Sequence, residues 1–532
     1  MSTIQSLENN WQRFFLWLGF PYLTLLAWIL PLLIFNSGQQ SLMAHDEGLY
    51  AIRARLMVDR GDWIHPWGAA HHKTPGPYWI IAIFYKFFGV SEISVRLPNM
   101  IFGTLSILIL YEIGLIILGK KIAWLGAAIC AVEFLWLQYC RLGAPDIPMI
   151  FLVLLAILCL LQAELNPKYR YILGFIVGLC FGIGFLVRSF MIVLPGVALL
   201  PYVIRENYRH RHLLNPGIYV GFLIGLLPSF GWLILASQRY GKATLDQLLG
   251  FVFALGSDNR HNNGPFFYLW NVPVKSFPWT FFAIYGAFLT FRHPLPKYQL
   301  LLVGFPLTLF IELSIFSTRL SHYSLLLYPF IGLLGAIALN ELANIFLTDK
   351  GKNLTRNLSF SYGALGIILL LAAIGILIFG SPNIQKYVPL GIVVGLSLLI
   401  LPTVWLGYYR FNKKSLKASH WIAGWLIPIW LGIAVAGGMG LIGDYNPDIK
   451  AFVKQPIVAE VLQTQPVNFV KVGGKTEVLL KFYTPTQGQF VDSVNKLSNG
   501  SYAWIPESVI SEVSQKYHII GRMQKYLLIV LK

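Results

Sequence analysis

Charged residues are scarce in this chain, and acidic residues are the scarcest. Asp and Glu number 23 against 41 Lys and Arg, and only 12% of the 532 residues are charged. Hydrophobic residues make up 56% of the chain, and its mean hydropathy is +0.63. These values lie far outside the usage of soluble globular domains. The composition therefore excludes an ordinary soluble protein and indicates an integral membrane protein.

Cysteine is also rare. The four cysteines are Cys130, Cys140, Cys159 and Cys180. All of them fall within or at the ends of apolar runs, and they form no CxxC pair, so neither a disulfide framework nor a zinc knuckle is indicated. The sequence also contains no internal repeat and no low-complexity tract, which counts against repeat architectures.

Long apolar runs are what the sequence has in abundance. About thirteen of them approach the roughly 20 residues that a helix needs to cross a hydrocarbon core of about 30 Å. They are residues 14–36, 94–118, 122–139, 147–164, 171–187, 190–204, 216–236, 267–290, 299–316, 323–346, 360–380, 388–408 and 420–440. Most loop Lys and Arg fall between these runs on one side, which is therefore predicted to be cytoplasmic. The net charge of +18 therefore reflects Lys and Arg in short loops, which orient the chain in the membrane, and it does not indicate a nucleic-acid partner.

The predicted outer side carries a long first loop and the C-terminal part of the chain. Within the first loop, residues 46–59 and 75–88 have helical apolar spacing and are expected to lie along the membrane surface. After Leu441 the long apolar runs stop, and short β-type runs broken by Gly and Pro follow. We therefore predict a transmembrane domain over residues 1–442 and a small soluble α/β domain over residues 443–532, on the outer face.

Ionisable side chains gather near the outer ends of the predicted spans. They are Asp46, Glu47, His72, Lys73, Arg141, Asp146, Arg188, His261, Arg319, His322 and Tyr323. Such groups are costly at membrane depth and mark functional sites. A carboxylate can accept a proton from a nucleophile, and Lys or Arg can neutralise a departing phosphate. Simpler explanations stay open, because Asp146 suits a helix N-cap and Arg188 and Arg319 suit interfacial anchors.

Several motifs, taken in order, resemble one known family. They are Asp46-Glu47-x-x-Tyr50, Gly61-Asp62-Trp63, Lys73-x-Pro75-x-x-Tyr78-Trp79, Arg141 to Asp146, Gly184 to Arg188, His261 before Pro265-Phe266, and Arg319-Leu320-x-His322-Tyr323. Their order and spacing resemble the polyprenyl-phosphate-sugar-dependent glycosyltransferases of GT-C type. Within these, the chain is similar to the bacterial branch that contains the 4-amino-4-deoxy-L-arabinose lipid A transferase, which is related to the protein O-mannosyltransferases. The resemblance covers most of residues 40–335.

The resemblance implies roles for individual residues. The catalytic carboxylates would be Asp46, Glu47 and Asp146, the last on the acceptor or sugar side. The donor phosphate would be held by Lys73, Arg188 and Arg319, where the family usually has a lysine at the last position. The substrate would be contacted by Tyr50, Tyr78, His322 and Tyr323. His261 matches a family position that can ligate a divalent metal ion, and its partner position, acidic in the family, is His72 here.

The expected function is therefore that of an inverting glycosyltransferase of the plasma (inner) membrane. It would move a sugar from a polyprenyl-phosphate carrier to a lipid or glycan acceptor at the outer face. Two alternatives stay open: a protein hydroxyl as the acceptor, and, from another class, a lipid or sugar transporter. Transporters usually show internal repeats and discontinuous helices near the midplane, whereas the ionisable residues here gather on one side.

Overall fold

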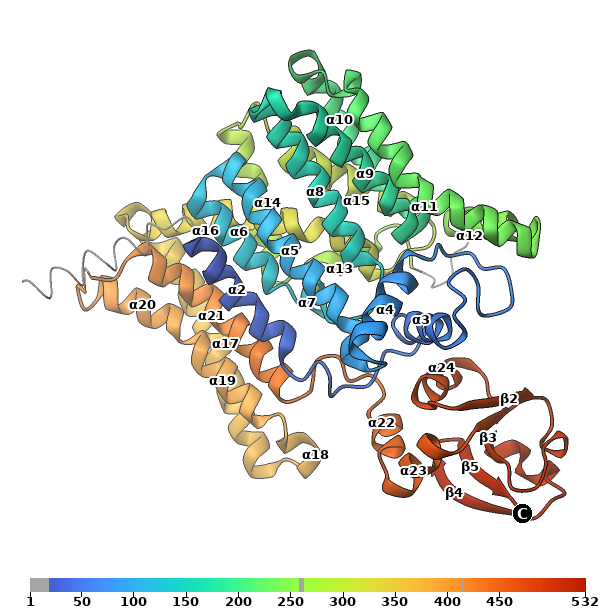
Figure 1. Ribbon diagram of the computed structural model, residues 1–532. Coiled ribbons are helices and arrows are strands. Elements are labelled where there is room, and N and C mark those ends of the chain that lie inside the picture. Colours follow the sequence, from blue (N-terminus) through green and yellow to red (C-terminus); the bar gives the residue numbers. More distant parts are fainter. Residues whose placement is uncertain (1–18, 258–262, 414) are drawn as a thin grey trace, which may run out of the picture.

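The computed structural model describes residues 19–257, 263–413 and 415–532 and consists mostly of long helices (Figure 1). The helices of the first half are α2 (Phe20–Ile34), α3 (Gly48–Arg60), α4 (Gly76–Phe88), α5 (Glu92–Leu118), α6 (Lys120–Ala131), α7 (Phe134–Cys140), α8 (Asp146–Leu165), α9 (Arg170–Arg188), α10 (Val193–His210), α11 (Pro216–Tyr240) and α12 (Ala243–Ser257). Those that follow are α13 (Phe267–Lys275), α14 (Trp279–Arg292), α15 (Phe305–Ile315), α16 (Tyr328–Phe346), α17 (Lys352–Phe379), α18 (Pro382–Gln385), α19 (Val388–Leu398), α20 (Ile400–Tyr409) and α21 (Ala418–Gly438).

Each predicted apolar run overlaps a helix, and the polytopic α-helical class is confirmed. Among the described residues, eight helical segments are long and apolar enough to cross a membrane, or nine if the bent pair α6 and α7 is one span. The predicted count of about thirteen also includes short or interrupted runs. Residues 171–187 and 190–204, predicted as two spans, fall on α9 and α10, which fold back on each other, since a Cβ atom added at Gly196 of α10 would lie 3.4 Å from the Phe181 ring of α9. Helices α6 and α7 meet at 70°.

Glycines allow α9 and α11 to pack closely against each other (Figure 1). They recur every fourth residue, at 174, 178 and 182 on α9 and at 217, 221 and 225 on α11. A Cβ atom added at Gly178 would lie 1.9 Å from the carbonyl oxygen of Ile218, and one added at Gly221 would lie 2.0 Å from that of Phe175. Small residues of this kind let helix backbones approach within membranes. This contact fixes the position of Arg188, the last residue of α9.

We expect Gly221→Ala to lower the thermal unfolding temperature of the purified protein in detergent. The added methyl group meets backbone atoms, and such overpacking costs about 1–3 kcal/mol. Gly231→Ala is the matched control on the same helix, because a Cβ atom there has no neighbour within 4 Å. It should leave the unfolding temperature unchanged or higher, since Ala favours helix. Equal effects of the two changes would contradict the close-packing account.

The C-terminal part forms a small α/β unit, as the sequence pattern predicts (Figure 1). Its elements are α22 (Pro447–Val453), α23 (Pro456–Thr464), β1 (Val467–Val470), α24 (Gly474–Tyr483), β2 (Gln487–Val491), β3 (Tyr502–Pro506), β4 (Tyr517–Met523) and β5 (Tyr526–Leu531). The strand order is β2-β1-β3-β5-β4. Strand β1 is parallel to both of its neighbours, whereas β5 is antiparallel to β3 and β4. We keep residue 443 as the proposed start of this domain.

Candidate active site

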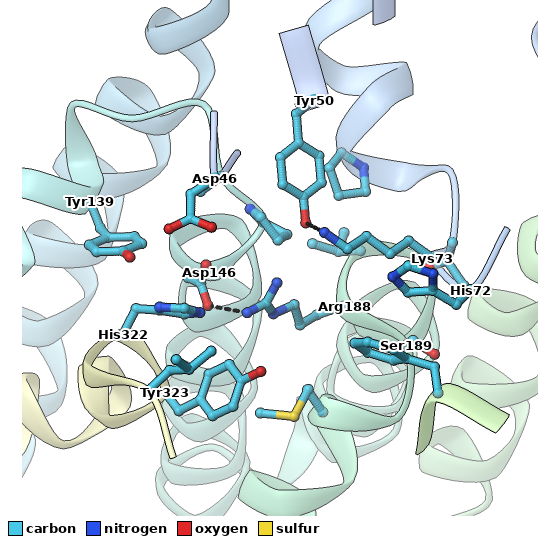
Figure 2. Close-up of a pocket in the computed structure, with 18 of the residues that line it drawn as sticks. Asp46, Tyr50, His72, Lys73, Tyr139, Asp146, Arg188, Ser189, His322 and Tyr323 are labelled. Carbon is cyan, nitrogen blue, oxygen red and sulfur yellow. Dashed lines mark hydrogen bonds and ion pairs between the residues drawn. The ribbon is translucent and has the colours of Figure 1, made fainter. Parts of the chain in front are cut away.

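A cavity of about 270 Å³ lies where the N-terminal ends of α3 and α8 meet the end of α9 (Figure 2). The first loop closes one wall of the cavity, and the segment before α16 closes another. The predicted site residues that line it are Asp46, Tyr50, His72, Lys73, Asp146, Arg188, His322 and Tyr323. Residues separated by up to 277 positions in the sequence, from 46 to 323, therefore share one cavity.

Asp146 and Arg188 form an ion pair on the floor of this cavity (Figure 2). The distance from Arg188 Nη2 to Asp146 Oδ1 is 2.9 Å, and both side chains are largely buried. Asp146 is the first residue of α8 and makes no capping bond of the N-cap type, because Pro145 occupies that position. The negative charge at a helix N-terminus is also favoured by the helix dipole. The arginine thus points into the cavity and does not act as an interfacial anchor.

Lys73 lies on the neighbouring wall, against Tyr50 (Figure 2). Its Nζ donates to the Tyr50 hydroxyl at 3.0 Å and lies 4.6 Å from the centroid of the same ring. The start of α4, three residues after Lys73, lies very close to α9: a Cβ atom added at Gly76 would lie 2.5 Å from the carbonyl oxygen of Leu186. Burial lowers the pKa of Lys73, and the positive charge of Arg188 adds to this effect. Lys73 and Arg188 therefore both line the same cavity.

The neighbours Asp46 and Glu47 face different environments. Asp46 is exposed, and its carboxylate points into the cavity (Figure 2). Glu47 is fully buried and does not line the cavity; its two carboxylate oxygens accept from Arg96 Nε at 2.7 Å and Arg96 Nη2 at 3.0 Å. Both oxygens of Glu47 are thus engaged in a bidentate ion pair. The position does not fit the predicted catalytic role of Glu47 and indicates a structural one.

Two further predicted residues lie outside the cavity lining. The guanidinium of Arg319 donates to the carbonyl oxygen of Ser314 at 2.9 Å and to that of Asn263 at 2.8 Å, so it satisfies backbone at the end of α15. Tyr78 is buried behind Tyr50, with the two ring centroids 5.3 Å apart. Neither position fits the direct substrate contact that the resemblance implies.

The predicted metal site has no ligand set in the part of the chain that the structure describes. His261 lies outside the described residues, and His72 stacks on Phe251 with ring centroids 4.2 Å apart. Among the described residues, no group of three or more His, Cys, Asp or Glu is arranged to hold a metal ion. The described residues supply no such ligand set, and the metal site at His261 and His72 stays a prediction.

Tyr139 and Ser189 line the cavity but were not predicted. The ring of Tyr139 stacks on His322 with centroids 5.3 Å apart. Tyr139 is the last residue of the apolar run 122–139, which is predicted to be one straight span. The 70° bend between α6 and α7 brings Tyr139 to the cavity wall. The one signal in the sequence is Glu133, a carboxylate inside that run, which stands at the break.

Comparison with known proteins agrees with the resemblance seen in the sequence. Residues 72–234 match the family model described as dolichyl-phosphate-mannose-protein mannosyltransferase. The undecaprenyl phosphate-alpha-4-amino-4-deoxy-L-arabinose arabinosyl transferase of Pectobacterium carotovorum is 26% identical over 460 residues, which cover 82% of this chain and 78% of that protein. The corresponding enzyme of Pseudomonas paraeruginosa is 28% identical over 247 residues, or 44% of each chain.

The fold is also similar to that of a solved structure. The crystal structure of ArnT from Cupriavidus metallidurans bound to undecaprenyl phosphate matches with a TM-score of 0.74 and 17% identity, over 96% of both chains. At this identity the likeness concerns the fold alone, and it confirms the predicted GT-C architecture. Together with the matches in sequence, it confirms that this chain is a membrane glycosyltransferase of the GT-C type, similar to the aminoarabinose and protein mannosyl transferases.

Proposed function

We propose that the protein is an inverting glycosyltransferase that takes a sugar from a polyprenyl-phosphate carrier. The observation that carries this proposal is one cavity with an exposed carboxylate, Asp46, facing two cations, Lys73 and Arg188. A carboxylate of this kind can act as a general base. The cations can stabilise the negative charge of a phosphate leaving group. Four other cavities of the described residues, by contrast, have no Asp or Glu in their lining.

An apolar pocket beside the cavity supports a lipid-linked donor. This pocket, of about 250 Å³, shares Arg188, Ser189 and Tyr323 with the cavity and continues between α10 and α15, where Leu194 and Leu313 line it. A lipid phosphate placed across the two would keep its charge beside Arg188 and its chain among apolar side chains. The similar fold of ArnT has been solved with undecaprenyl phosphate. The carrier is therefore proposed to be a polyprenyl monophosphate.

The proposed reaction is a single displacement at the anomeric carbon of the sugar. Asp46 accepts the proton of the acceptor hydroxyl, and the hydroxyl oxygen attacks the anomeric carbon as the bond from that carbon to the phosphate oxygen breaks. The electron pair of this bond leaves with the phosphate, where Lys73 and Arg188 stabilise the charge. Because attack and departure take place on opposite faces, the configuration inverts.

Tyrosine and histidine side chains complete the proposed substrate site. Burial raises the pKa of Tyr50 to about 12, so the residue remains a phenol at neutral pH. Its oxygen accepts from Lys73, which leaves its own hydrogen available to the phosphate. We place the sugar between Tyr139, His322 and Tyr323 on the opposite wall (Figure 2). Tyr78 supports Tyr50 from behind.

We place this site on the outer face of the plasma (inner) membrane. The argument is the gathering of loop Lys and Arg on the other side. A reporter that is active only outside, fused after residue 532, should give signal, and the same reporter fused after Lys417 should be silent. The reverse pattern would contradict this orientation.

The donor is tested by deleting the gene and analysing extracted lipids by mass spectrometry. A polyprenyl phosphate carrying one sugar should accumulate, and its mass identifies the sugar. The purified protein should then release free polyprenyl phosphate from that donor, but only with its acceptor present. A lipid or glycan acceptor is proposed, and transfer to a peptide hydroxyl in the same assay would favour the alternative acceptor. Accumulation of a carrier diphosphate sugar would contradict the proposed donor.

Arg319→Ala separates a structural arginine from a phosphate-binding one. Because its guanidinium bonds backbone carbonyl oxygens, we expect the variant to lose about 2 kcal/mol of stability, a typical loss for hydrogen bonds to a charged group. Its KM for the donor should stay close to that of the wild type. Thermal unfolding and transfer kinetics of one preparation measure both quantities. An unchanged stability with a raised donor KM would show instead that Arg319 binds the donor phosphate.

A further inference from the structure

Asp46 follows a segment, residues 37–43, that is tied down along its length. On one side lies Arg96 of α5, which is buried and donates to the carbonyl oxygens of Ser37 and Ser41. The same guanidinium holds Glu47, whose carboxylate also accepts from the backbone N–H of Met43 at 3.0 Å. The chain on both sides of Asp46 is therefore fixed by one arginine.

Residues from the start of the C-terminal domain hold the same segment from the other side. Asp444 Oδ1 accepts from the backbone N–H of Ser41 at 3.0 Å and from its hydroxyl. The Asn446 backbone N–H donates to the Ser41 hydroxyl oxygen at 2.6 Å, and its side-chain amide donates to the carbonyl oxygen of Leu42 at 2.9 Å. Lys450 donates to the carbonyl oxygen of Gly38 at 3.2 Å. These contacts join positions about 400 residues apart in the sequence.

Helix α24 of the C-terminal domain lies against α3, the helix that begins at Gly48, just after Asp46 (Figure 1). A Cβ atom at Gly48, the first residue of α3, would lie 3.1 Å from the Val478 side chain. Arg55 of α3 donates to the carbonyl oxygens of Phe482 and Pro485, at 2.6 and 2.9 Å. Side chains of α3, α4 and the C-terminal domain also share one buried apolar cluster.

We propose that the C-terminal domain positions Asp46 for catalysis, through Asp444 and Asn446 before it and α24 after it. This inference rests on the proposed role of Asp46 as the base. Among the described residues, none that lines the cavity comes from beyond Tyr323, so the domain acts on the reaction only through the segment that it holds. Displacing a catalytic group by about 1 Å can cost a factor of about 10² in rate. Asp444 and Asn446 are thus positioning residues.

The first test is Asp444→Ala in the full-length protein. We expect kcat to fall about tenfold because the carboxylate of Asp46 is no longer fixed. The donor KM should not change, since the cations that bind the phosphate are untouched. Asp444→Asn keeps the Oδ1 acceptor and should restore most of the rate. Asp448→Ala is the matched control, because it removes an exposed carboxylate four residues away and should behave as the wild type.

The second test repeats Asp444→Ala in a protein that already carries Asp46→Asn. If Asp444 acts through the Asp46 carboxylate, it should have little further effect there, so the two losses are non-additive. An equal fold-loss in both backgrounds, or a parallel rise in donor KM, would overturn the positioning role. If Asp46 is not the base, the Asp46→Asn protein alone remains active. This outcome is distinct from the result for Asp444→Ala, which tests the contact with the C-terminal domain. An active Asp444→Ala protein would overturn the inference and leave the proposed function intact.

Discussion

Asp46→Asn is expected to reduce the rate of sugar transfer at least about 100-fold, the usual range for losing a general base. The amide keeps the size of the side chain and its hydrogen-bonding shape, but it cannot accept the proton of the acceptor hydroxyl. Because Asp46 is exposed to the cavity, the change should not alter folding or membrane insertion. Transfer kinetics with the purified protein, together with its unfolding temperature, measure both effects.

Glu47→Gln is the matched control for this prediction, since it removes the neighbouring carboxylate. Glu47 is buried against Arg96, and breaking a buried ion pair costs about 3–5 kcal/mol. Its main effect should therefore be on stability, with any loss of rate following from a displaced Asp46. A fully active Asp46→Asn protein would remove this residue from the role of base. A stable Glu47→Gln protein that has lost all activity would exchange the roles of the two carboxylates.

The difference between these neighbours shows where prediction from the sequence ends. The order and spacing of the motifs place Asp46, Asp146 and Arg188 in one site, and the structure brings all three to one cavity. The sequence does not reveal which way a side chain points. Glu47 and Arg319 carry the expected charges, yet Glu47 is paired with Arg96, and Arg319 donates its hydrogen bonds to backbone carbonyl oxygens. Direction depends on packing partners that are remote in the chain.

The bends and contacts of the chain were equally hard to predict. Apolar composition predicts helices, but it does not locate the 70° break between α6 and α7 that turns Tyr139 to the cavity. The β-type runs predict a small α/β domain after Leu441, as the structure shows. Its contacts with the segment before Asp46 depend on single polar residues such as Asp444, and no periodic pattern marks them.

Lys73→Ala and Arg188→Ala are each expected to reduce kcat/KM at least about 30-fold, which corresponds to about 2 kcal/mol for a lost charge-assisted contact. The donor phosphate carries charge in the ground state, and this charge grows on the leaving group in the transition state. Both KM and kcat should therefore suffer. Arg188→Ala should be the worse of the two, because it also leaves Asp146 as a buried carboxylate without its partner.

The double variant decides whether the two cations share one phosphate. If Lys73 and Arg188 bind the same group, removing the second costs less than removing the first, and the losses are non-additive. Asp146→Asn in the Arg188→Ala background should recover stability but not transfer, since it removes the unpaired carboxylate charge without restoring the cation.

The lowered pKa of Lys73 predicts a pH dependence of transfer. As pH rises, kcat/KM should begin to fall before an ordinary lysine deprotonates, and this fall should be absent in Lys73→Ala. Two mild losses that simply add, with an unchanged pH profile, would place the phosphate outside this cavity.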